Sequence, residues 1–203
     1  MFDTQHSPRK ETMAITKKLE RNVTIKGTTE ILFDRYAGDI KTKLAPEQKM
    51  YLNSKNELVL PSLNIISFLS AENTESAAKL LLDKREYKTV CSALLASVQI
   101  APAYIPFTRG GKNIKFGGSF TDDVDPVSGI KIIRHVARLP KGIPNSKERP
   151  MLGLDWNLEF KMTIFPNPDL NEDMIENLFV DGGSRLGLGT FRKAFGKFEF
   201  AWS

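Results

Sequence analysis

Residues 154–203 have the sequence LDWNLEFKMTIFPNPDLNEDMIENLFVDGGSRLGLGTFRKAFGKFEFAWS, and this stretch decides the fold. From Leu154 to Ile164 apolar and polar side chains alternate, which predicts a strand with one buried face and one polar face. Asn171 is a candidate N-cap for a following helix, and Gly182 is placed to end that helix in a left-handed conformation. Residues Phe195 to Trp202 alternate again and predict a closing strand.

Strand, helix and strand in this order form half of a ferredoxin-like sandwich. Residues 19–26 also alternate, and after Pro61 the apolar residues recur at helical spacing. We therefore expect an α+β protein with a ferredoxin-like or RRM-like antiparallel sheet, helices on one face and inserted β elements. Residues 1–18 are polar and aperiodic, which predicts a flexible N-terminal arm, and residues 19–203 are expected to form a single domain.

Shorter patterns predict the remaining elements. Ser62 is a candidate N-cap for the first helix, and the polar residues 72–75 are expected to divide that region into two helices. A third helix is expected from Tyr87 to Val98, with a strand at its end as the alternative. The other expectations are short strands at 30–34, 57–61, 104–107 and 114–116, an acidic turn at 122–126, a long strand at 130–139 and a surface loop at 140–150.

The composition excludes several classes of protein. The 203 residues are 41% hydrophobic, which suffices for a globular core, and no apolar run is long enough to span a bilayer. A single cysteine, Cys91, excludes an intrachain disulfide, fits a reducing compartment and predicts a cytoplasmic protein. Two distant histidines do not suggest zinc, and the acidic turn ends in Pro126 without the residues of a calcium loop. We expect no metal and no cofactor.

The net charge of +5 is unevenly distributed. Residues 109–149 contain nine basic and four acidic residues, whereas residues 150–203 contain five basic and eight acidic residues. A local excess of positive charge is typical of a surface that meets phosphate groups, although solvated loops also carry lysine and arginine.

The segment from Gly182 to Lys193 combines four glycines with three cations. Glycine permits a positive φ and lets backbone amides approach a phosphate, and the cations can add charge-assisted contacts. The alternative is that the glycines serve only a helix end and a tight turn. Neither a dinucleotide fingerprint nor a P-loop is present.

Aromatic residues could stack bases in an RRM-like protein. Phe198, Phe200 and Trp202 share one face of the closing strand, which favours a core role. Better candidates lie next to cations, and these are Phe107, Phe116 and Phe191. His135 lies in the long strand predicted at 130–139, and it could be a general base or a structural residue.

The run from Gly182 to Phe200, preceded by the Trp156 strand and its helix, resembles the closing motif of the RAMP superfamily. That superfamily includes the crRNA-binding backbone subunits of CRISPR effector complexes and related proteins of phages and mobile elements. Leu60-Pro61-Ser62 is similar to the strand-to-helix transition that precedes the family's first helix. The resemblance implies an RRM-like core with insertions, a glycine-rich loop that contacts RNA, and self-association of subunits along the strand.

We therefore expect a non-enzymatic protein that binds single-stranded RNA, or alternatively DNA, and forms homo-oligomers without membrane attachment. Two alternatives remain open: a phage-type protein that acts on a protein partner, and a metal-independent endoribonuclease that uses His135. The expected nucleic-acid-binding residues are Arg109, Lys112, Lys115, Arg134, His135, Arg138, Gly183, Arg185, Gly187, Gly189, Arg192 and Lys193.

Overall fold

The computed structural model describes residues 14–39, 42–72, 74–138 and 144–203, with the backbone alone at residues 137, 138, 144 and 145. The elements are β1 (Leu19–Gly27), β2 (Ile31–Leu32), the 3-10 helix η1 (Pro46–Lys49), β3 (Val59–Pro61), α1 (Ser62–Ser70), α2 (Ala77–Leu81), α3 (Glu86–Ser97), β4 (Val98–Ala101), β5 (Tyr104–Arg109), β6 (Lys112–Asn113), β7 (Lys131–Arg138), β8 (Pro144–Leu152), β9 (Asn157–Ile164), α4 (Glu172–Arg185) and β10 (Phe198–Trp202).

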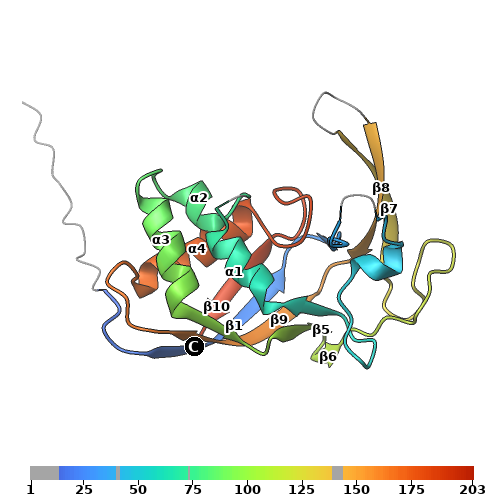
Figure 1. Ribbon diagram of the computed structural model, residues 1–203. Helices are drawn as coiled ribbons and strands as arrows, with labels where there is room; N and C mark the ends of the chain where they lie inside the picture. Colours follow the sequence, from blue (N-terminus) through green and yellow to red (C-terminus); the bar gives the residue numbers. More distant parts are fainter. Residues whose placement is uncertain (1–13, 40–41, 73, 139–143) are drawn as a thin grey trace, which may run out of the picture.

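The main sheet is antiparallel and has the strand order β10-β1-β9-β5-β3, with β4 also paired to β9 and β6 to β5. The four helices lie on one face of this sheet (Figure 1). The predicted α+β fold of ferredoxin-like or RRM-like type is therefore confirmed.

Alternation along the central strands explains which face the helices cover. In β9, Leu158, Phe160 and Met162 are buried, whereas Glu159 and Lys161 are exposed. The strand predicted between Leu154 and Ile164 is thus confirmed from Asn157 onward. Burial of each large apolar side chain stabilises the fold by roughly 1.5–3 kcal/mol relative to exposure. The packing of this face against the helices therefore stabilises the arrangement of sheet and helices.

Helix α4 begins as predicted, because the side chain of Asn171 accepts a hydrogen bond of 2.7 Å from the Met174 amide. The predicted end at Gly182 is wrong, since the helix continues to Arg185 and the positive φ of 80° falls at Gly187. Gly182 is needed for packing instead: a Cβ there would lie 2.8 Å from Cζ of Phe68 in α1.

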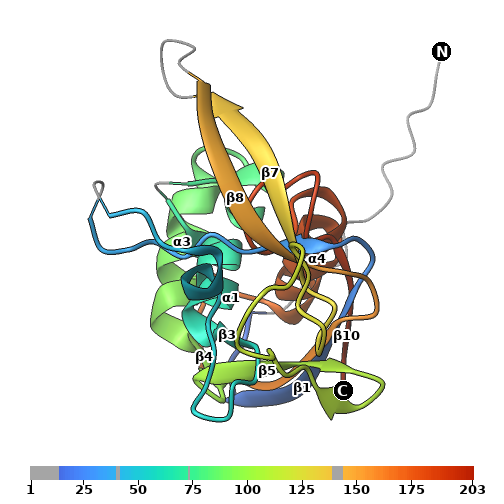
Figure 2. The ribbon, with the colours of Figure 1, turned by 90° about the vertical axis from the view of Figure 1, so that its right-hand side faces the viewer.

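A second antiparallel sheet has the order β2-β8-β7. Strands β7 and β8 form a two-stranded ribbon that rises beside the helices (Figures 1 and 2). The long strand predicted at 130–139 is confirmed as β7. The loop predicted at 140–150 is wrong from Pro144 onward, because β7 provides a partner for β8 from Pro144 to Met151.

Other boundaries differ in smaller ways. Ser62 is the first residue of α1 and Pro61 occupies the N-cap position. The helix predicted from Tyr87 is confirmed as α3 up to Ser97, and the alternative of a strand at its end is confirmed by β4, which begins at Val98. The strand predicted at 114–116 is wrong, because the hairpin closes with β6 at Lys112–Asn113. The arm predicted for residues 1–18 is wrong at Ile15, which is buried and accepts a hydrogen bond from the Asn167 amide; residues 1–13 lie outside the described part.

Candidate nucleic-acid interface

The C-terminal loop, defined as residues 186–197, is tied to the rest of the molecule through its backbone. The amide of Leu188 donates to the Gly196 carbonyl at 2.8 Å, and the Gly196 amide donates to Glu30 at 2.7 Å. The Thr190 amide donates to the Leu32 carbonyl at 3.0 Å, beside β2. The loop is therefore held against the ribbon's sheet.

The glycines of this region allow segments of backbone to approach one another. A Cβ at Gly183 would lie 2.6 Å from the Phe198 ring, one at Gly187 2.7 Å from Gly196, and one at Gly189 2.5 Å from the Leu32 carbonyl oxygen. The amide of Gly187 donates to the Gly182 carbonyl at 3.0 Å. These contacts account for glycine at positions 183, 187 and 189 without any bound phosphate. They favour the alternative in which the glycines serve the backbone conformation and close packing.

The loop also brings three aromatic side chains together, which we call the aromatic shelf: Phe191, His135 and Phe195. The rings of Phe191 and His135 stack with centroids 5.4 Å apart and an angle of 24° between planes. Phe195 meets His135 edge-on at 5.9 Å. Since His135 belongs to β7, the shelf joins the ribbon to the C-terminal loop.

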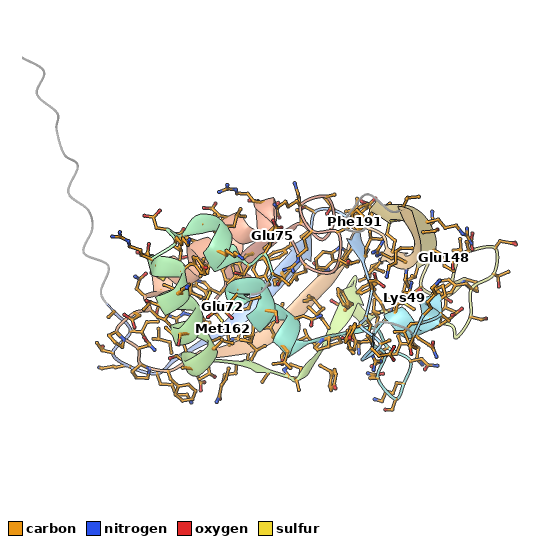
Figure 3. The ribbon with its side chains drawn as sticks, turned by 45° about the horizontal axis from the view of Figure 1, so that its top comes forward. Lys49, Glu72, Glu75, Glu148, Met162 and Phe191 are labelled. Atoms are coloured by element: carbon orange, nitrogen blue, oxygen red, sulfur yellow. The ribbon has the colours of Figure 1, made fainter. Side chains whose placement is uncertain are left out.

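Phe191 is the accessible member of the predicted base-stacking set. Its side chain is 40% exposed, whereas Phe107 and Phe116 are 0% and 4% exposed and contribute to the core. The predictions for Phe107 and Phe116 are therefore wrong. Phe191 has a φ of 55°, a conformation that is costly for a bulky residue, and its ring lies 4.9 Å from the guanidinium carbon of Arg149. Figure 3 labels Phe191 at the end of the molecule that carries the ribbon.

The main sheet presents no aromatic surface comparable to the shelf on the exposed positions of β1 and β9. Phe198 is buried, and Phe200 stacks on Phe179 of α4 at 4.4 Å, so the core interpretation of the closing-strand aromatics is confirmed for these two. On β1 and β9 the exposed positions of the opposite face carry mixed polar and charged side chains, among them Thr24, Lys26, Glu159 and Lys161. These exposed positions of β1 and β9 offer no aromatic ring for bases.

Several predicted cations are engaged in contacts within the protein. Arg109 donates to the carbonyls of Ser128 at 3.1 Å and Gly153 at 3.5 Å, so it links β5 to two loops. Arg134 bonds Asp123 and Glu148, each at 3.0 Å. These contacts raise the pKa of Arg134, and its guanidinium lowers the pKa of Asp123.

Two cations of the C-terminal loop converge on one glutamate. Arg192 donates to the Glu75 carbonyl at 2.9 Å, and Lys193 pairs with the Glu75 carboxylate at 2.6 Å. Burial lowers the pKa of Arg192, and the Glu75 carboxylate opposes that shift. These contacts fasten the loop to the segment before α2.

The predicted residues do not form one continuous site. His135 belongs to the junction of ribbon and loop, whereas Arg192 and Lys193 bond Glu75 before α2. Lys112 and Lys115 are exposed on or beside the β5–β6 hairpin, which lies at the sheet rather than beside the ribbon (Figure 1). Arg185 is exposed on α4 and lines a separate hollow with Leu81 at the end of α2 and the following Leu82. Arg138 ends β7, and its side chain lies outside the described part.

The ribbon contributes two cations that the sequence prediction did not select. Lys147 lies directly opposite His135, and Lys131 lies on the same face of β7 as His135. Among the described residues neither lysine forms an ion pair. Lys147 was missed because its segment was predicted to be a loop, and residues 145–149 show no alternation of apolar and polar side chains that would indicate a strand.

No group of three potential ligands among the described histidine, cysteine and acidic residues could hold a metal ion. Cys91 is buried, which raises its pKa and suppresses thiolate chemistry. In the part of the chain that the structure describes, no helix has both the length and the apolar character needed to cross a membrane. A scan against models of known protein families finds no match, and a search of curated proteins finds no significantly similar sequence.

Arg109→Ala is expected to lower the free energy of unfolding by about 1–3 kcal/mol, because two loop carbonyls lose their charged donor. The exposed Lys112→Ala removes the same charge from the same hairpin and should change stability by less than about 0.5 kcal/mol. Urea unfolding of both variants measures the difference. Equal stability of the two variants would contradict a structural role for Arg109.

Proposed function

We propose that the protein binds single-stranded nucleic acid, with RNA preferred over DNA, where the β7–β8 ribbon meets the C-terminal loop. The observation that carries this proposal is the exposed ring of Phe191, stacked at 5.4 Å on His135 and held at a positive φ. Every base has a π face, so an exposed aromatic side chain can stack bases with little sequence preference. Backbone strain of this kind is often retained at binding sites.

The charge of the ribbon supports the same proposal. Strands β7 and β8 contain five basic residues and one acidic residue. Arg134 and Arg149 are paired with carboxylates, which leaves Lys131 and Lys147 available for phosphate among the described side chains. Both lie on the face of the ribbon that carries His135. A base on the shelf would thus have cations on either side of it.

The resemblance to the RAMP superfamily belongs to this proposal. A ferredoxin-like core with an inserted ribbon agrees with the architecture that the resemblance implies. We extend the proposal to side-by-side assembly of several copies along one strand. Analytical ultracentrifugation with oligonucleotides of increasing length tests this: the number of bound copies should rise with length, and a constant single copy would contradict it.

Binding itself is tested by fluorescence anisotropy with a labelled single-stranded RNA at rising salt. Phe191→Ala is expected to weaken binding about 5- to 150-fold, which corresponds to about 1–3 kcal/mol of stacking per base. Phe191→Leu is the matched variant, because it retains apolar bulk beside Arg149 and lacks the aromatic face. Wild-type affinity of the leucine variant, or no binding by the native protein at low salt, would refute the proposal.

Phosphate contact is tested by the slope of log K against log salt, which changes by about 0.7 for each contact to a single strand. Lys131→Ala should flatten the slope by about this amount, whereas Lys112→Ala on the distant hairpin should leave it unchanged. Equal slopes for the two variants would place the phosphates elsewhere. RNA recovered intact on a denaturing gel agrees with binding alone; cleavage that is lost in His135→Ala would favour the endoribonuclease alternative.

A further inference from the structure

Lys49, at the end of η1, is a buried cation with incomplete charge compensation. Lys49 is 8% exposed, and its Nζ donates a hydrogen bond to the Glu148 carbonyl. The nearest carboxylate oxygen, Oδ1 of Asp34, lies 3.8 Å from Nζ. Burial is the main cause of a lowered pKa of Lys49, and the charges of Lys147 and Arg149 add to it while Asp34 opposes it.

The same carboxylate also serves Arg149. Nε and Nη2 of Arg149 each lie 3.0 Å from Oδ2 of Asp34, and the arginine is 5% exposed. Its Nη1 is buried without a partner in the described part of the chain. Two buried cations therefore share one carboxylate, and buried charge without compensation is costly.

A cavity of about 540 Å³ opens beside Lys49, between residues 34–39 and 42–44 on one side and β8 on the other. Besides Lys49, its walls carry three cations: Arg35, Lys43 and Lys147. Figure 3 shows Lys49 and Glu148 close together at this end of the molecule.

Three carboxylates face the cavity, and each has partners within the protein. Asp34 bonds Arg149, and Glu148 pairs with Arg134 at 3.0 Å. Asp39 accepts hydrogen bonds from the amide and hydroxyl of Thr42 at 2.7 and 2.6 Å. Lys43 and Lys147 form no ion pair among the described residues, so the cavity retains an excess of positive charge.

We propose that this cavity binds a phosphate group, which supplies the negative charge that Asp34, already paired with Arg149, does not fully provide for Lys49. Lys43 and Lys147 contact the phosphate from the two walls, and Lys49 contributes its charge from the floor. The group comes either from free phosphate or from a nucleic-acid backbone, since both present the same oxygen atoms. The site shares Lys147 with the proposed nucleic-acid interface but makes no use of Phe191, His135 or Phe195.

The test measures Tm in 10 mM inorganic phosphate against sodium chloride of equal ionic strength. A site with a dissociation constant of about 1 mM should raise Tm by about 3–6 °C in a protein of this size. The double variant Lys43→Gln/Lys147→Gln should lose this rise. Lys112→Gln/Lys115→Gln removes the same charge from the β5–β6 hairpin and should retain it. Phosphate also stabilises proteins non-specifically. The proposal is therefore judged by the difference in the phosphate-induced rise in Tm between the two double variants.

An equal rise in the native protein and both double variants, or no rise at all, overturns the proposal. A single-stranded oligonucleotide that produces the same cavity-dependent rise identifies the backbone as the source of the phosphate, whereas a rise with inorganic phosphate alone identifies the free ion. Phe191→Ala should leave the phosphate effect unchanged. Failure of the nucleic-acid proposal is therefore distinguishable from failure of this site.

Discussion

Gly196→Ala is expected to lower the free energy of unfolding by about 3–5 kcal/mol, the sum of left-handed backbone strain and severe overpacking. Gly196 has a φ of 72°, and a Cβ there would lie 1.9 Å from the Leu188 carbonyl oxygen. That oxygen belongs to backbone, so no side-chain rotation can relieve the contact. The C-terminal loop would have to move, and with it Phe191.

Gly111→Ala is the matched control, because its φ is 75° and no atom lies within 4 Å of the added Cβ. It should cost only the strain of the left-handed conformation, about 1–2 kcal/mol. Urea unfolding, with an unchanged m-value, measures the loss in free energy of unfolding for each of the two variants. If the two alanine variants were equally stable, the tight backbone contact at Gly196 would not be a source of stability. Nucleic-acid binding should fall in Gly196→Ala and persist in Gly111→Ala.

Asp125→Ala is expected to lower the free energy of unfolding by about 3–5 kcal/mol, because the buried amide and hydroxyl of Ser128 and the amide of Gly117 would lose their charged acceptor. The Asp125 side chain is 0% exposed and accepts from the Gly117 amide at 3.0 Å, the Ser128 amide at 2.9 Å and the Ser128 hydroxyl. It thereby closes the segment between β6 and β7 and sets the base of the ribbon.

The matched control is Asp181→Ala, which removes an exposed aspartate from α4 and should change stability by less than about 0.5 kcal/mol. The stability loss of Asp125→Asn should fall between those of Asp125→Ala and Asp181→Ala. The asparagine oxygen can still accept a hydrogen bond, but its NH2 group would face a donor of the protein. Thermal unfolding distinguishes the three variants, with a fall of roughly 6–20 °C expected for Asp125→Ala. A fall as small as that of Asp181→Ala would show that the network is dispensable.

Local periodicity predicted the fold class because each strand and helix of the C-terminal block has its own pattern. Alternation between Leu154 and Ile164 defines the buried face of β9, and the Asn171 side chain caps α4 as its position suggested. These signals depend on residues within one or two turns of each other. They therefore survive without knowledge of the tertiary structure.

The errors arose where a distant partner determines the local structure. Gly182 and Gly183 lie inside the helix and are glycine because Phe68 and Phe198 approach the helix backbone too closely for a side chain. Pro144 begins β8, where a missing amide is tolerated, and pairing with β7 makes a strand of the segment. Ile15 is buried because the chain before β1 pairs with Asn167.

The candidate interface was predictable only in part. The sequence identified Phe191, His135 and the cations of the C-terminal loop, but it could not distinguish Phe191 from the buried Phe107 and Phe116. Nor could it show that Arg109 and Arg134 bond carbonyl and carboxylate groups of the protein. Exposure and pairing depend on contacts between segments far apart in sequence, which periodicity does not encode.

The glycine-rich C-terminal segment illustrates the difference between what the local sequence determines and what the tertiary structure determines. By itself the sequence determined a strand, a helix and a closing strand, since the periods of buried side chains are local. Only the tertiary structure decided that the glycines serve backbone contacts with β2 and β10 and that Phe191 meets His135 on the ribbon. The reason is physical: close packing joins surfaces from separate parts of the chain, and their complementarity appears only when those parts meet.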